Sequence, residues 1–152
     1  PTPCPDRTGL YAEIIRDMNR LLAEWRRAGR IGNATVEAAV VPVWSRTLGE
    51  FRAPFEVGDG QLDGMELESA ELFRLDNPYW HDDAVVFARN YVKSVQAWGG
   101  PLFRRAFARE SETRADGLLA DFLGELVDRV ADDPDRYRWD YVEALIICRK
   151  QR

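Results

Sequence analysis

The sequence has very few of the residues that carry metal and nucleophilic chemistry. It contains one histidine, His81, and two cysteines, Cys4 and Cys148, at opposite ends of 152 residues. This histidine stands in an aromatic-rich turn beside two acids, a setting that gives no His-based catalytic triad. Because it is the sole histidine, the sequence has no metal-ligand spacing either. A disulfide between the two cysteines remains an alternative, but free thiols in a reducing cytoplasm fit the sequence better.

Long apolar runs, phosphate-binding loops and an excess of positive charge are missing as well. No run approaches the roughly 18 apolar residues of a membrane helix, so no membrane span is expected. The net charge of -5 argues against a nucleic-acid surface and against docking to anionic lipid. Gly58 and Gly60 precede a predicted strand, which indicates a turn and no phosphate cradle. We therefore predict no catalytic residue within this chain.

The sequence otherwise has the composition of a globular protein. Hydrophobic residues make up 45% and charged residues 31%, and 152 residues suffice for one domain with a buried core. Three prolines among the first five residues indicate that residues 1–9 form a loose terminus. Because the sequence opens within such a segment and without methionine, we interpret it as a fragment of a longer protein.

Apolar residues recur with helical spacing in three long segments. Residues 10–28 and 115–131 each have one apolar stripe and a charged opposite face, which predicts two amphipathic helices. Residues 84–98 are predicted to form a third helix, ended by Gly99-Gly100. Pro101 is typical of a first helical turn, so a separate helix is expected over residues 102–108.

Two shorter helices are predicted in the N-terminal third. Residues 33–41 begin with Asn33 or Thr35 as an N-cap and end where Pro42 favours extended backbone. The sequence Thr47-Leu48-Gly49-Glu50 has the form of a capping box, which predicts a helix over about 48–55.

Two segments have the pattern of strands. Residues 65–75 alternate imperfectly and carry glutamates on one side, which indicates a half-exposed strand. Residues 139–148 end in five apolar residues, a pattern typical of a strand buried on both faces. We predict a mostly helical α+β fold in a single domain, with a helical cap from residues 10–57 and 81–132 and a small antiparallel pair of strands.

Aromatic residues gather at loop exits and helix ends. Packing in the core is the plainer interpretation of each one, and His81 also has the position of a residue that precedes a helix. The alternative is an apolar pocket for a small organic ligand, which aromatic side chains commonly line. The candidate substrate-binding residues are Trp44, Tyr79, Trp80, His81 and Trp98.

Three segments together resemble one protein family. Residues 31–55, with Val41-Pro42-Val43-Trp44 before the predicted capping box, lead to Gly64-Met65-Glu66-Leu67 at the start of a strand. Residues 87–107 resemble a helix pair of the same family, although Lys93-Ser94 stands where Arg-Ala is usual. Residues 141–150 resemble its last strand. The family is that of the S-adenosylmethionine-dependent carboxyl methyltransferases of the salicylate/benzoate/theobromine (SABATH) type and their bacterial relatives, which have the class I fold.

The resemblance implies a function that this chain would perform only in part. The family binds S-adenosylmethionine on a glycine-rich strand–turn–helix unit that has no match here, so the cofactor site would lie upstream. The chain would be the substrate-capping C-terminal portion, inactive alone, and its partner would be the upstream half. The methyl acceptor would be a small organic molecule, attacked at an oxygen. Ala39-Val40-Val41 offers no counterpart to the family's metal-associated asparagine, so no metal is expected.

Other interpretations remain open. A helical module of a regulatory protein, binding a small ligand or mediating dimerisation, would also explain the amphipathic helices, but it leaves the final strand unexplained. A stand-alone fold of another kind is the third alternative. For the chain as given, unpaired strand edges are expected to favour homo-oligomers.

Overall fold

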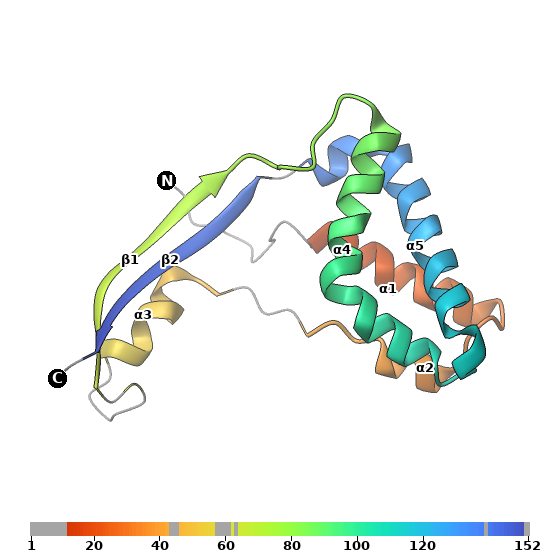
Figure 1. Ribbon diagram of the computed structural model, residues 1–152, viewed down its shortest axis with the longest axis horizontal. Helices are drawn as coiled ribbons and strands as arrows, with labels where there is room; N and C mark the ends of the chain where they lie inside the picture. The colour runs from red at the N-terminus through yellow and green to blue at the C-terminus, as the bar shows by residue number, and fades with distance from the viewer. Residues whose placement is uncertain (1–11, 43–45, 57–61, 63, 139, 151–152) are drawn as a thin grey trace. The chain divides into compact units, whose positions relative to one another are not determined.

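The computed structural model describes residues 12–42, 46–56, 62, 64–138 and 140–150. It confirms the predicted mostly helical α+β fold with one antiparallel pair of strands (Figure 1). The elements in chain order are α1 (Ala12–Arg27), α2 (Asn33–Ala38), α3 (Leu48–Glu56), β1 (Met65–Leu75), α4 (Ala84–Phe107), the 3-10 turn η1 (Glu112–Arg114), α5 (Ala115–Asp132), the 3-10 turn η2 (Pro134–Tyr137) and β2 (Tyr141–Lys150).

The elements fall into two compact units. The ribbon unit comprises α3, β1 and β2, and the helical unit comprises α1, α2, α4, α5 and the two 3-10 turns. The chain passes from one unit to the other several times, so neither unit is a continuous segment. The helix α3 thus belongs with the strands and not with the other helices. That residues 1–152 form a single domain stays a prediction.

The helical unit has its own aromatic core, where α1, α4 and α5 meet. The Trp25 ring of α1 lies 5.8 Å from Phe107 of α4 and 5.7 Å from Phe122 of α5. Phe103 and Phe122 approach to 4.9 Å between ring centroids. These side chains are buried, and burial of each stabilises the unit by about 1.5–3 kcal/mol. The amphipathic stripes predicted for residues 10–28 and 115–131 therefore face this core.

The predicted break in the middle of α4 is wrong. One helix runs from Ala84 to Phe107 through Gly99, Gly100 and Pro101, and Figure 1 shows it bending partway along. Both glycines are buried, and a Cβ on Gly99 would lie 3.2 Å from the Phe103 ring. The glycines therefore let the next turn pack closely. Side chains buried before and after Gly99–Pro101 offset the local cost of two glycines and a proline within a helix.

Neither predicted residue caps α2. The helix begins after Gly32, which has no side-chain cap, and it ends at Ala38 instead of Val41. The carboxylate of Glu110, beyond the end of α4, accepts hydrogen bonds from the Gly32 backbone N–H at 2.6 Å and from the Thr35 hydroxyl. Thr35 is fully buried. A distant acid thus takes the place of a local cap.

The capping box of α3 is confirmed. The Glu50 N–H donates to Thr47 Oγ1 at 3.2 Å, and the Thr47 N–H donates to Glu50 Oε2 at 2.7 Å. The helix continues through Pro54 to Glu56. On its other side, Arg52 donates to the backbone carbonyl of Ala70 in β1 at 2.8 Å. This hydrogen bond ties α3 to the ribbon.

The two strands form a long antiparallel ribbon. Met65 pairs with Lys150 at one end and Leu75 with Tyr141 at the other, with an irregular register at Glu68. The strand β2 begins and ends two residues later than predicted. Its expected burial on both faces is not found: Leu145 is 48% and Ile147 41% exposed. One neighbouring strand and one helix cannot cover both faces of a strand.

The described helices include none long and apolar enough to span a membrane.

Candidate functional site

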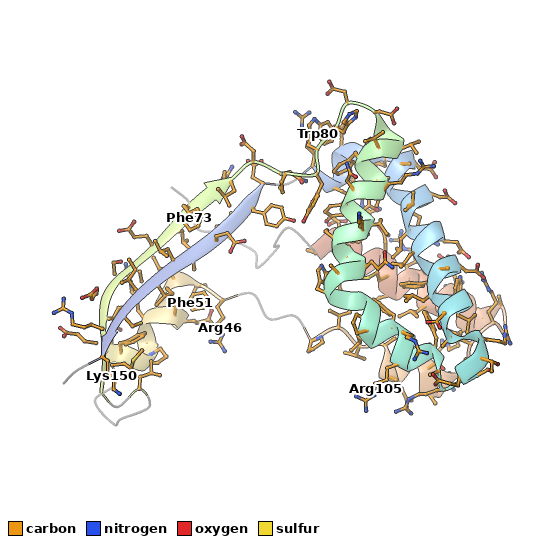
Figure 2. The ribbon with its side chains drawn as sticks, in the orientation of Figure 1. Arg46, Phe51, Phe73, Trp80, Arg105 and Lys150 are labelled. Carbon is orange, nitrogen blue, oxygen red and sulfur yellow. The ribbon has the colours of Figure 1, made fainter. Side chains whose placement is uncertain are left out.

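Four of the five predicted site residues lie in the helical unit, and Trp44 lies outside the described residues. Tyr79, Trp80 and His81 lie in the turn that leads into α4, where Figure 2 labels Trp80. Trp98 lies on α4 itself. The structure therefore brings three of the candidates together. Trp98 belongs to the same helix further along.

Tyr79 and Trp80 rest on the aromatic side of α4. The Trp80 ring lies 5.1 Å from Phe87, and the Tyr79 ring lies 6.3 Å from Tyr91. Both rings are half-buried and pack against the core cluster. Much of their apolar surface is therefore used in holding the turn, and their remaining exposed edges are what a ligand would meet.

His81 and Asp83 organise the start of α4. The carboxylate of Asp83 accepts hydrogen bonds from the N–H groups of Val85 at 2.9 Å and Val86 at 3.0 Å, which lowers the pKa of Asp83. The Asp83 N–H donates to Nδ1 of the exposed His81 at 2.9 Å. In this arrangement the proton of a neutral His81 sits on Nε2. His81 thus has a structural role at the helix N-terminus.

Trp98 lies seven residues after Tyr91 and hence on the same face of α4. It is 37% exposed, whereas Tyr91 is fully buried. Ser94 lies between them on that face and donates to the Tyr91 carbonyl at 2.6 Å. The face that supports Tyr79 thus continues along the helix as far as Trp98.

Arg138 contributes to this turn and was missed from the sequence. Its guanidinium carbon lies 4.1 Å from the centroid of the Trp80 ring. Arg138 directly follows η2, and only the tertiary fold brings it to the turn before α4. No local pattern in the sequence signals this contact, because Trp80 and Arg138 are 58 positions apart.

A polar cluster around the buried Asp17 joins η2 to α1. Tyr137 is buried and its hydroxyl donates to the carboxylate of Asp17, which is 1% exposed. Arg136 and Arg20 each lie 3.3 Å from that carboxylate. Burial and the hydrogen bond with Asp17 raise the pKa of Tyr137. Because these side chains hydrogen-bond and form ion pairs with one another, we interpret the cluster as a contribution to stability and not as a binding site.

The ribbon unit has a separate hollow of about 330 Å³ against α3. Arg46 and Phe51, shown in Figure 2, lie at it, with the guanidinium carbon 5.9 Å from the ring centroid. None of the predicted site residues in the described part of the chain lines this hollow. Its lining residues are Arg46, Glu50, Phe51, Pro54, Phe55, Leu62 and Ile146.

Within the described ranges, no group of three His, Cys, Asp or Glu side chains is placed to hold a metal ion. Comparison of the sequence with protein-family models and with curated proteins gave no match. The functional argument therefore depends on the geometry of the chain itself.

Proposed function

We propose that this chain is the substrate-capping C-terminal portion of an S-adenosylmethionine-dependent methyltransferase that acts on a small organic molecule at an oxygen. In this proposal the cofactor site lies in an upstream half. The ribbon completes the sheet of that half, and the helical unit contributes the wall around the methyl acceptor. The proposal assigns no catalytic residue to the 152 residues.

The observation that carries the proposal is that large apolar side chains lie on both faces of the ribbon. Ala70 and Ile146 lie on one face, where α3 covers them. Phe73 and Leu145 lie on the other face, paired with Glu143 and Glu71, and are 43% and 48% exposed. Strands with two apolar faces are typical of sheets that carry helices on both sides, as in class I α/β folds. The apolar residues on both faces therefore favour a sheet that continues into another part of the protein.

The two strands differ in ways that favour further pairing at β2. The strand β1 carries Glu66, Glu68 and Glu71, and its register is irregular at Glu68. Charged side chains and bulges are common devices of outer strands. The middle of β2, before the terminal Arg149 and Lys150, is instead a run of Leu145, Ile146, Ile147 and Cys148. We therefore propose that the next strand of the sheet adds to the free edge of β2.

The proposed chemistry does not need acid or base groups from this chain. A carboxylate oxygen is ionised at neutral pH. It would form the new C–O bond in line as the C–S bond of the sulfonium breaks, and S-adenosylhomocysteine would leave as the neutral thioether. Positioning of the two reactants and exclusion of water can lower the barrier by up to about 7–11 kcal/mol. The exposed edges of Tyr79 and Trp80, with His81 beside them, supply the kind of surface that would position an aromatic acceptor. Trp98, about 20 Å further along α4, would meet another part of the bound molecules.

The coding sequence immediately upstream of Pro1 tests the proposal most directly. We expect it to encode a strand followed by a glycine-rich turn and a helix. A helix-turn-helix segment, or a stop codon, in that place would contradict the proposal. Extension of the chain through the upstream segment should then yield methyl transfer from S-adenosylmethionine to small organic acids.

Calorimetry on the 152-residue chain provides a second test. We expect no heat of binding with S-adenosylmethionine, because no part of this chain resembles a cofactor site. Micromolar binding by the chain alone would contradict the assignment of the cofactor site to an upstream half.

A second candidate function is a helical ligand-binding or dimerisation module of a regulator. The observation that favours it is the separate buried core of the helical unit. The ribbon has no role in this candidate, and the upstream sequence distinguishes the two.

A further inference from the structure

The outer edge of β2 has no strand beside it among the described residues. The ribbon has two strands, so each has one neighbour (Figure 1). No described residue outside the ribbon forms a backbone hydrogen bond with residues 141–150. The strand is also regular, because the irregular register lies in β1 at Glu68. A long, regular strand with a free row of N–H and C=O groups is a template for a further strand.

The side chains of β2 are arranged symmetrically about Ile146. Leu145 and Ile147 lie one residue to either side of it, and Glu143 and Arg149 lie three residues to either side. Because successive side chains of a strand alternate between faces, these four share the face opposite to Ile146. Leu145 and Ile147 are 48% and 41% exposed, and the two charged residues are exposed as well. Along this face the strand therefore carries an acid, two apolar residues and a base, in that order.

This order selects the direction in which a second copy can pair. Parallel pairing in register would place Glu143 opposite Glu143 and Arg149 opposite Arg149, and like charges directly opposite each other are unfavourable. Antiparallel pairing centred on Ile146 instead places Glu143 opposite Arg149 of the other copy, and Leu145 opposite Ile147. Arg149 already pairs with Glu68 of its own chain, but its guanidinium has further N–H donors for a second carboxylate.

We propose that the free edge of β2 pairs antiparallel with the same edge of a second copy of this chain, about a two-fold axis beside Ile146. The four strands then form one sheet in the order β1, β2, β2, β1. The assembly closes at two copies, because a two-fold axis uses the same edge of both chains. The strand β1, with its glutamates and its irregular register, stays outermost.

This dimer goes beyond the proposed function, because it requires only the 152 residues of this chain. A strand from an upstream half would occupy the same edge and displace the second copy. The dimer is therefore the state of the chain without that strand. Its presence or absence does not depend on what the upstream sequence encodes, so the dimer and the proposed function can fail separately.

Sedimentation velocity on the 152-residue chain measures the assembly. We expect a monomer–dimer equilibrium with a dissociation constant of about 10 μM. In Glu143→Arg alone, and in Arg149→Glu alone, both charge pairs of the dimer become like-charged, so the dissociation constant should rise about tenfold. In a dimer of one variant with the other, both pairs again join unlike charges. An equal mixture of the two variants should therefore regain the dimer.

Glu37→Arg is the matched control for the charge change. Glu37 is exposed on α2, in the helical unit, and its substitution should leave the dissociation constant unchanged. Circular dichroism checks that each variant keeps its helices.

The native Cys148 reports the register independently. It lies opposite Ala144 of the other copy in the proposed pairing, so Ala144→Cys should give a disulfide-linked dimer with oxidised glutathione as the oxidant. Cys4→Ser is introduced in every protein of this test, which leaves Cys148 as the only native thiol. Positions 144 and 148 of one chain are about 13 Å apart along the strand, which is too far for an internal disulfide. Val142→Cys, on the same face but opposite Lys150, is the matched control and should stay unlinked.

Four results would overturn the proposal. They are a monomeric parent chain at ten times the expected dissociation constant, species larger than a dimer, a mixture of the two charge variants that dimerises no better than either alone, and a disulfide-linked dimer in Val142→Cys but not in Ala144→Cys.

Discussion

The hydroxyl of Tyr137 donates a hydrogen bond to the carboxylate of Asp17, and both side chains are buried. This contact joins η2 to α1 across 120 positions of the sequence. Arg136 completes the arrangement, because it pairs with the same carboxylate and with Glu13. The segment that leads to Arg138 is thereby fixed to the first helix.

Removal of the Tyr137 hydroxyl should destabilise the chain without changing its fold. We expect Tyr137→Phe to lower the free energy of unfolding by about 1–3 kcal/mol, because Asp17 stays buried with only its arginine partners. Urea denaturation followed by circular dichroism measures the loss. In a double-mutant cycle with Asp17→Asn, the two losses should not add. Strict additivity would show that the contact contributes nothing.

The same tyrosine should make stability depend on alkaline pH. Burial, followed by the hydrogen bond and the charge of Asp17, raises the pKa of Tyr137 above its ordinary value of about 10. The unfolded chain therefore releases this proton near pH 10, while the folded chain retains it. The contribution is fully present below about pH 10 and is lost as the pH rises toward the folded pKa.

Denaturation midpoints at increasing pH, compared between the parent chain and Tyr137→Phe, measure this alkaline contribution. The variant should lose less stability above pH 10 than the parent chain. Equal slopes in the two proteins would contradict a raised pKa at Tyr137.

Glu110 should make the stability of the fold depend on pH in the acid range. Here stability is lost as the pH falls, whereas Tyr137 causes a loss as the pH rises. The Thr35 hydroxyl and then the Gly32 N–H lower the pKa of Glu110. Its contribution is present above the ordinary carboxylate pKa and is lost as the pH falls through the lowered value. At neutral pH, Glu110→Gln should lower the free energy of unfolding by about 1 kcal/mol.

Glu37→Gln is the control for this substitution. It removes an exposed acid from α2 itself. The Glu37 side chain takes part in no hydrogen bond or ion pair among the described residues. The control should retain the acid dependence, and Glu110→Gln should lose part of it. If both variants behave alike, the carboxylate of Glu110 does not hold α2 in place.

Sequence reasoning found the elements whose signal is local and missed those that depend on distant partners. The stripe from Ile14 to Trp25 and the capping box at Thr47 are readable because all their residues lie within a few turns. The break predicted at Gly99 failed because close packing against Phe103 occurs only in the folded helix.

The candidate site shows the same limit. The cluster of Tyr79, Trp80 and His81 is visible in the sequence because the three residues are consecutive. Arg138 reaches Trp80 only through the fold, and the contact of Glu110 with Thr35 spans 75 positions. Both are polar side chains on segments without periodicity, so no pattern marks them. Sequence analysis therefore named the aromatic half of the site and omitted its cation.

The uncovered face and edges of the ribbon should make the isolated chain associate. Two strands with open edges and an apolar face are marginal alone, so we expect a dimer or larger species by light scattering. Leu145→Glu, at a residue 48% exposed in β2, should shift the chain toward monomer, because it places a charge on that face. Val85→Glu, at a residue 45% exposed on α4, is the matched control and should leave association unchanged. A monomeric parent chain, or equal dissociation of both variants, would show that the ribbon does not drive assembly.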